Sequence, residues 1–110
     1  MGGGVDQVFG ALADPTRRFV LEVLAGRESA SQSELAAQVP VTRQAVAKHL
    51  STLAAAGLVR SERRGRETRY VLEATPLDEA AAWLEQVGTE WDGRLEALAR
   101  HVEERAVAET

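Results

Sequence analysis

The sequence predicts a mainly α-helical protein with one small β-hairpin. Before residue 57, apolar residues recur at three- and four-residue spacing, which is typical of amphipathic helices. Between residues 58 and 72 the pattern changes to two β-type runs around a glycine, which predicts a hairpin. From residue 77 to 102 the helical spacing returns, over about seven turns. A length of 110 residues suits one domain of this kind.

Capping residues predict where the helices begin and end. The expected helices span residues 5–12, 15–25, 31–39, 42–56 and 75 to beyond 102. Asp14 is a favourable N-cap in front of Pro15, and Thr42 can cap the fourth helix. Residues 31–34, Ser-Gln-Ser-Glu, have the form of a capping box, and Gly57 is a typical helix terminator.

The hairpin completes the predicted fold. Its strands are expected at residues 58–63 and 68–72, joined by a basic turn around Gly65. A helix-turn-helix followed by such a hairpin is a winged helix-turn-helix, in which the hairpin is the wing. Gly88 and Gly93 leave open whether the last helix is continuous, kinked or split.

The net charge of −4 conceals a basic segment. Residues 41–72 carry seven basic and two acidic residues, whereas the flanking segments are acidic. This pattern favours a nucleic-acid-binding surface with one docking orientation, and the alternative is a charged face that only meets water. Arg17 and Arg18 open the second helix against the preference of the helix dipole, which indicates that they have partners elsewhere.

The helix predicted at 42–56 has the features of a recognition helix. Val46, Leu50 and Leu53 share one face and are expected in the core. The opposite face presents Thr42, Arg43, Gln44, Ala45, Lys48 and His49. In the major groove Arg43 can pair with guanine, Gln44 with adenine, and Ala45 can touch a thymine methyl group. The other three side chains suit phosphates, and the alternative is a polar face with no ligand.

The wing carries three further candidate DNA contacts. Arg63, Arg64 and Arg66 flank the turn, where a narrow loop can reach a flanking minor groove or its phosphates. Two other wing arginines have an alternative role: Arg60 and Arg69 can pair with Glu62 and Glu67 across the hairpin.

Six short motifs occur in a characteristic order. They are Ala13-Asp14-Pro15-Thr16-Arg17-Arg18, Glu34-Leu35-Ala36, Ala45-Val46-Ala47-Lys48-His49-Leu50, Ala56-Gly57-Leu58-Val59, Arg64-Gly65-Arg66 and Tyr70-Val71-Leu72. Together they resemble the ArsR family of small winged-helix transcriptional repressors, over residues 5 to about 104. The resemblance implies a homodimer that binds an imperfect inverted repeat in double-stranded DNA, represses transcription and is released by an effector.

The resemblance also implies that the first and last helices form the dimer interface. The residues assigned to that interface are Val5, Val8, Phe9, Leu12, Leu84, Trp91, Leu95 and Leu98. An effector pocket near Trp83 and Trp91 is the alternative, although Trp at helical spacing is more often part of a core. The identity of any small-molecule effector stays open.

The metal sites of the family are not matched. The chain has no cysteine, so the cysteine pair that metal sensors carry near the third helix is absent. The other family site, on the last helix, aligns with Gly88, Glu90, His101 and Glu104, so two of its four ligands survive. We therefore expect no metal and no cofactor, and the two tryptophans suggest the metal-independent branch of the family.

Three further expectations concern organisation and class. Residues 1–4 are expected to be a flexible lead, 5–104 the DNA-binding and dimerisation domain, and 105–110 a tail. No membrane span or signal-peptide pattern occurs, which suggests a cytoplasmic protein. No nucleophile or phosphate-loop motif accompanies the two histidines, so we expect no enzyme. The alternative function is a protein-interaction module on the same scaffold, without specific DNA binding.

Overall fold

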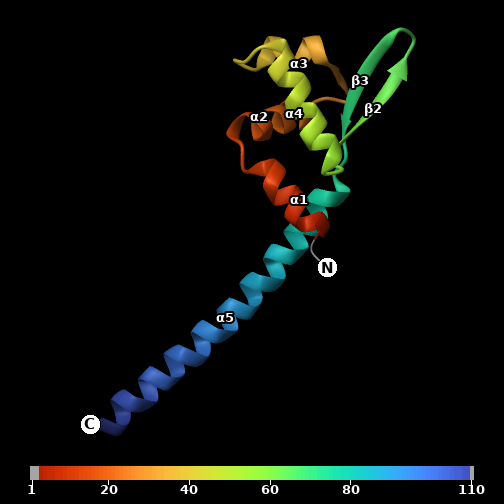
Figure 1. The fold of residues 1–110 in the computed structure, drawn as a ribbon. Coiled ribbons are helices and arrows are strands. Elements are labelled where there is room, and N and C mark those ends of the chain that lie inside the picture. The colour runs from red at the N-terminus through yellow and green to blue at the C-terminus, as the bar shows by residue number, and fades with distance from the viewer. Residues whose placement is uncertain (1–2, 110) are drawn as a thin grey trace. The chain divides into compact units, whose positions relative to one another are not determined.

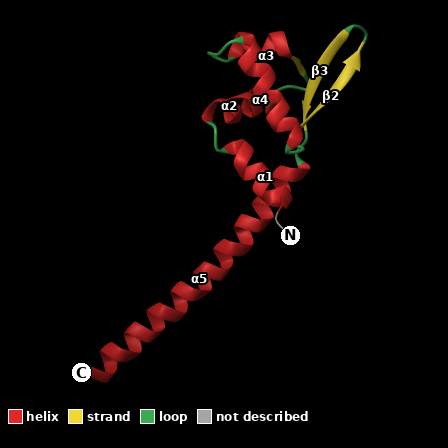
Figure 2. Ribbon diagram, viewed as in Figure 1, coloured by secondary structure: helices red, strands yellow, loops and turns green. Residues whose placement is uncertain are grey.

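The computed structural model describes residues 3–109, and the side chains of residues 4–105. The elements are α1 (Gly3–Leu12), α2 (Pro15–Ala25), β1 (Ala30–Ser31), α3 (Gln32–Gln38), α4 (Arg43–Ala55), β2 (Val59–Arg64), β3 (Glu67–Leu72) and α5 (Thr75–Glu109) (Figures 1 and 2). Part of the expected lead, residues 1 and 2, and the last residue of the expected tail, 110, lie outside the described residues. The fold is therefore mainly helical with a small antiparallel sheet, as the sequence predicts.

Local capping chemistry determines where three helices begin. The Asp14 carboxylate accepts the backbone N–H of Thr16 at 2.7 Å and that of Arg17 at 3.2 Å at the start of α2. Ser31 and Glu34 form the complete capping box at the start of α3. The Thr42 hydroxyl accepts the N–H of Ala45 at the start of α4. These caps satisfy donors that have no partner inside the helix, and all three predicted caps are confirmed.

The two arginines that open α2 contact the end of the preceding helix. Arg17 donates from Nε to the carbonyl of Ala11 at 2.7 Å and from Nη2 to that of Gly10 at 3.1 Å. Arg18 donates to the carbonyl of Leu12 at 2.5 Å. The last carbonyls of α1 thus gain charged partners, which explains why cations stand at the start of α2.

The sheet has three antiparallel strands in the order β1-β3-β2. Within the wing, Val59 pairs with Leu72 and Arg64 with Glu67, and Gly65 has a φ of +64° at the turn. On the other edge of β3, Ala30 of β1 pairs with Tyr70. The two-residue strand β1 is absent from the sequence prediction, because so short a segment carries no period of its own.

The core lies where α2, α3, α4 and β2 meet. Its largest fully buried side chains are Leu24, Leu35, Leu50, Leu53, Leu58, Val8, Val20 and Val46. The predicted inward face of α4 is therefore confirmed. Val8, assigned to the dimer interface from the sequence, is only 1% exposed in the single chain and belongs to this core. One apolar stripe does not reveal which of its members turn toward the protein's own core.

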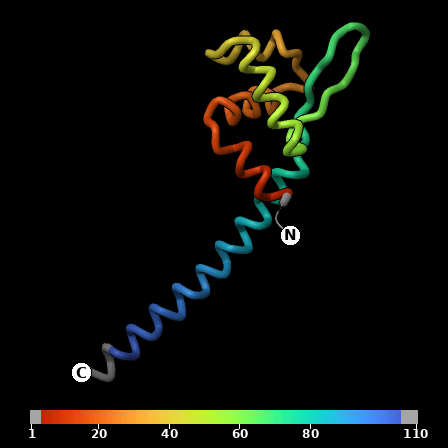
Figure 3. The backbone as a smooth tube through the Cα atoms, viewed as in Figure 1, coloured from red at the N-terminus to blue at the C-terminus, as the bar shows by residue number. Residues whose placement is uncertain are grey.

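α5 is one uninterrupted helix through Gly88 and Gly93, so it is not split (Figure 3). It belongs to two structural units, one that ends at Ala80 and one that begins at Ala81. In the first unit, Ala80 is buried in the core. In the second, the large apolar side chains are exposed. None of the described helices has the length and apolarity needed to cross a membrane.

Candidate nucleic-acid interface

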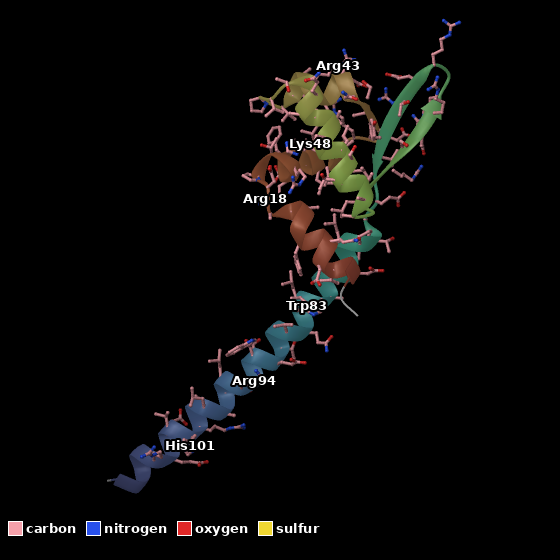
Figure 4. All side chains as sticks on the ribbon, viewed as in Figure 1. Arg18, Arg43, Lys48, Trp83, Arg94 and His101 are labelled. Carbon is pink, nitrogen blue, oxygen red and sulfur yellow. The ribbon has the colours of Figure 1, made fainter. Side chains whose placement is uncertain are left out.

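The polar face of α4 is exposed as predicted at four of its six positions. Thr42, Arg43, Gln44 and Lys48 are exposed, whereas Val46 on the opposite face is fully buried. Figure 4 labels Arg43 and Lys48 on this helix. The two remaining positions of the predicted face, Ala45 and His49, are half-buried. The Nδ1 atom of His49 is buried and has no hydrogen-bond partner among the described atoms. The most exposed side chains of this face are therefore those at the start of α4 and that of Lys48.

α3 holds the first turn of α4. The guanidinium of Arg43 donates to the Ser33 hydroxyl, and the side-chain amide of Gln32 donates to the Arg43 carbonyl at 3.1 Å. Both partners lie in the first turn of α3. The side chain most suited to read a base is thus oriented by the neighbouring helix. Sequence patterns did not reveal these contacts, which join residues about ten positions apart.

Arg60 is ion-paired at the base of the wing. Its guanidinium contacts Glu62, two residues along the same strand, and Glu73, just after β3. The two carboxylates raise the pKa of Arg60. The pairing with Glu62 is expected from the sequence, but it runs along β2 and not across the hairpin.

Arg64 and Arg69 are also ion-paired. Arg64 contacts Glu62 at 2.9 Å and the hydroxyl of Ser29 at 3.4 Å. Arg69 contacts Glu67 at 3.1 Å and Glu34 at 2.8 Å. Arg69 thus pairs with Glu67 as the alternative predicts, but along β3 and not across the hairpin, and Glu34 is an additional partner.

Four other cations of the basic segment have no such partner. Within the described part of the chain, no carboxylate forms an ion pair with Arg43, Lys48, Arg63 or Arg66. Arg63 donates only to the carbonyl of Gly65, at 3.2 Å. Figures 1 and 3 show the wing tip and the start of α4 at the same end of their unit. The cations of the basic segment that have no carboxylate partner therefore lie on these two elements.

Three carboxylates that stabilise this arrangement stay ionised to low pH. The backbone N–H groups of Arg17 and Thr16 lower the pKa of Asp14. The backbone N–H of Ser31, and then the guanidinium of Arg69, lower the pKa of Glu34. Arg60 and Arg64 lower the pKa of Glu62. The caps and ion pairs are thus fully charged at neutral pH.

In the second unit, α5 exposes an apolar stripe at helical spacing. Its exposed members are Trp83, Leu84, Trp91, Leu95, Leu98 and Val102, with Leu98 59% exposed. The guanidinium of Arg94 lies 5.5 Å from the centre of the Trp91 ring. All four interface residues that the sequence placed on this helix are in the stripe. Of the candidates on α1, Val5 is half-exposed, and Phe9 and Leu12 pack partly against the core.

No group of three or more His, Cys, Asp or Glu side chains that could hold a metal ion occurs among the described residues. His101 and Glu104, the two surviving positions of the family site, both lie exposed on α5. His101 is labelled near the C-terminal end of the helix in Figure 4.

Known proteins share both the sequence and the fold. A family model described as a helix-turn-helix domain matches residues 12–62. An HTH-type transcriptional regulator of Bacillus subtilis, YuzN, is 39% identical over 92 residues, which cover 77% of this chain and all of the relative. The transcriptional repressor SdpR of the same organism is 29% identical over 80 residues, covering 73% of this chain and 88% of SdpR.

A solved structure of an ArsR-like transcriptional regulator from Rhodococcus sp. RHA1 superposes with a TM-score of 0.78. It is 48% identical and covers 86% of this chain, and the match covers 89% of that structure. The helices, the wing and the six sequence motifs described above are those expected for a protein of this kind. The chain belongs to the ArsR family of winged helix-turn-helix transcriptional regulators.

Proposed function

We propose that the protein is a sequence-specific transcriptional repressor that binds an inverted-repeat operator as a homodimer. Residues 42–56 enter the major groove, and the wing, residues 60–69, contacts the flanking minor groove or the DNA backbone. Membership of a family of transcriptional regulators and the likeness to a named repressor support this proposal. A regulator of this kind acts where the DNA is, so we place it in the cytoplasm.

The observation that carries the proposal is the division of the basic residues. Arg60, Arg64 and Arg69 are neutralised by carboxylates, whereas the four cations on α4 and the wing tip are not. Exposed cations without a carboxylate partner are suited to phosphates, because phosphate binding releases the counterions condensed on DNA. Their location on the two elements that contact DNA in a winged helix-turn-helix favours DNA over other polyanions.

The dimer is proposed from the apolar stripe of α5. Single exposed apolar side chains are common, but a contiguous row of large ones on a monomer usually marks an interface. Leu84, Trp91, Leu95 and Leu98 of this row, with Val5, Phe9 and Leu12 of α1, are the proposed contacts. A two-fold dimer would place two recognition helices on two half-sites, which matches an inverted repeat.

Fluorescence anisotropy with DNA from upstream of the protein's own gene tests the proposal. A scrambled duplex is the control, and both are titrated at 50 and 200 mM salt. We expect a preference for the native duplex of about 10³ or more, and a loss in affinity of ~10³–10⁵ between the two salt concentrations. Weak binding that is equal for both duplexes and insensitive to salt would contradict it.

The second candidate is a protein-interaction module on this scaffold, which the same exposed stripe of α5 favours. Light scattering separates the two. A monomer near the chain mass of 11.9 kDa would favour the interaction module, because the stripe would then be open to a different protein. A particle of twice that mass would favour the repressor.

A further inference from the structure

Arg69 is the cation of the wing whose guanidinium is most fully used within the protein. Its side chain is only 19% exposed. Nη1 contacts Glu34 at 2.8 Å and Glu67 at 3.1 Å, Nε donates to the Ser29 hydroxyl at 2.7 Å, and Nη2 donates to the Ser29 carbonyl at 3.2 Å. All three nitrogens are therefore engaged, and the group has little capacity left for a DNA phosphate.

Glu34 connects this arginine to the helix-turn-helix. The carboxylate oxygen that contacts Arg69 also accepts the backbone N–H of Ser31 at 3.1 Å, at the start of α3. The other oxygen contacts Arg27 at 3.4 Å. The first turn of α3 in turn binds Arg43 of α4 through Ser33 and Gln32. A continuous chain of contacts thus joins β3 of the wing to the first turn of α4.

The base of the wing is held by the core, where Val59 is only 3% exposed and Tyr70 packs against the buried residues. On its outer edge, β3 pairs with β1 at only two residues, Ala30 and Ser31, so the contacts of Arg69 bear on the outer part of the hairpin. An outer hairpin that moves in the free protein would have to lose conformational freedom when it binds DNA, and that loss lowers affinity. A hairpin already anchored in the free protein avoids most of this cost.

We propose that the Arg69–Glu34 pair is a positioning device for DNA binding and that Arg69 makes no DNA contact. The pair fixes the wing tip relative to α4, so that Arg63, Arg66 and Lys48 reach phosphates while Arg43 occupies the major groove. This inference rests on the proposed DNA-binding function. It assigns positioning roles to Arg69 and Glu34, neither of which contacts DNA in the proposal.

The substitution Glu34→Gln tests the proposal, because simple electrostatics and the positioning role predict opposite changes in DNA affinity. Gln at this position can still complete the capping box, so the start of α3 is kept. Of the two carboxylate charges that contact Arg69, the one that connects it to α3 is lost, and Glu67 of its own strand remains. Simple electrostatics predicts tighter binding, because a negative charge near DNA is removed. The positioning role predicts binding weaker by about tenfold, from the wing that must now be ordered on the DNA.

Three variants serve as controls. Glu28→Gln removes a charge from a side chain that is 90% exposed and 4.0 Å from Arg64, and should leave binding unchanged or slightly tighter. Arg66→Ala should weaken binding and reduce the steepness of the salt dependence by about one unit of slope. Arg69→Lys keeps the positive charge but cannot make the same set of bonds. It should weaken binding with the salt dependence unchanged, and it replaces Glu34→Gln if that variant does not fold.

Hydrogen exchange measured without DNA adds a readout that does not depend on binding. In Glu34→Gln, the exchange of the β2 and β3 amides should be accelerated by a larger factor than that of the amides in α2 and the core of α4. Uniformly faster exchange would indicate a general loss of stability and would overturn the positioning role. Unchanged exchange in the wing would also overturn it.

The outcomes separate this inference from the proposed function. If Glu34→Gln binds DNA as tightly as the wild type or tighter while Arg66→Ala binds more weakly, the positioning role is wrong and the DNA-binding function stands. If Arg69→Lys lowers the salt slope as Arg66→Ala does, Arg69 contacts a phosphate and the inference is wrong. If the wild type shows no salt-dependent DNA binding, the proposed function fails, and the positioning role fails with it even where exchange shows an anchored wing.

Discussion

The base of the wing and its tip carry the same kind of residue in opposite electrostatic states. At the base, Arg60 and Arg69 each contact two carboxylates, and their pKa values are raised. At the tip, Arg66 has no carboxylate partner among the described residues, and Arg63 bonds only a carbonyl. Cations next to each other in sequence can therefore have different functions. Those at the base hold the wing in place, and those at the tip are available to a polyanion.

The largest effect on DNA binding is expected at Arg43 of α4. Like Arg63 and Arg66 at the wing tip, it has no carboxylate partner among the described residues. Arg43→Ala should lose about 1–3 kcal/mol of discrimination at one base position, because a bidentate contact to guanine is removed. The measurement is anisotropy against a panel of duplexes with single base changes. An equal loss for every duplex would place Arg43 on a phosphate instead. Lys48→Ala, in the same helix but suited to phosphates, is the matched control.

The next largest effect is expected at Arg66 at the wing tip. Arg66→Ala should weaken binding to all sequences about three- to tenfold, because one charged contact to the DNA backbone is lost. The slope of log affinity against log salt should become shallower by about one. A loss confined to one sequence would contradict a backbone contact.

Acidification should remove the ion pairs that distinguish the base of the wing from its tip, because it protonates the carboxylates in those pairs. The folded-state pKa values of Glu34 and Glu62 are lowered, so the stability that they supply is present above the unfolded value of about 4.3 and is lost as pH falls through the folded values. Urea unfolding of the wild type and Glu34→Gln at neutral pH and near pH 3 measures this. The wild type should be the more stable at neutral pH, and the two should converge in acid. If the difference in the free energy of unfolding persists in acid, it does not arise from the ionisation of Glu34.

The smallest effect is expected at Arg64, which lies next to the turn at the wing tip but is ion-paired, as the arginines of the base are. Its guanidinium already contacts Glu62 and Ser29, and a contact with DNA would have to replace those bonds. Arg64→Ala should therefore weaken DNA binding by less than about twofold, well below Arg66→Ala, since an exposed ion pair contributes little. A loss as large as that of Arg66→Ala would show that Arg64 leaves Glu62 when DNA is bound.

Much of the fold could be predicted because its signals are local. The caps at Asp14, Ser31 and Thr42 each act on backbone groups two or three residues away, and a sequence displays that spacing directly. The buried face of α4 follows from one helical period, and so does the exposed face that carries Arg43 and Lys48. The predicted helices and hairpin agree with the structure to within a few residues.

The remaining features depend on contacts between distant segments. β1 exists only because β3 lies beside it, and Val8 is buried because α1 packs on the core. Arg17 and Arg18 find carbonyl partners in the preceding helix, which the dipole argument suggested but could not locate.

The helix boundaries, the hairpin and the outward face of α4 follow from the amino-acid sequence alone, since each depends on neighbours within about one helical turn. Which arginines stay unpaired depends on how the chain folds in three dimensions. Arg69 and Glu34 are far apart in the chain, and their contact requires that the sheet bring the wing next to α3. Charge pairing acts through space over a few ångströms, so it depends on where the fold places each side chain.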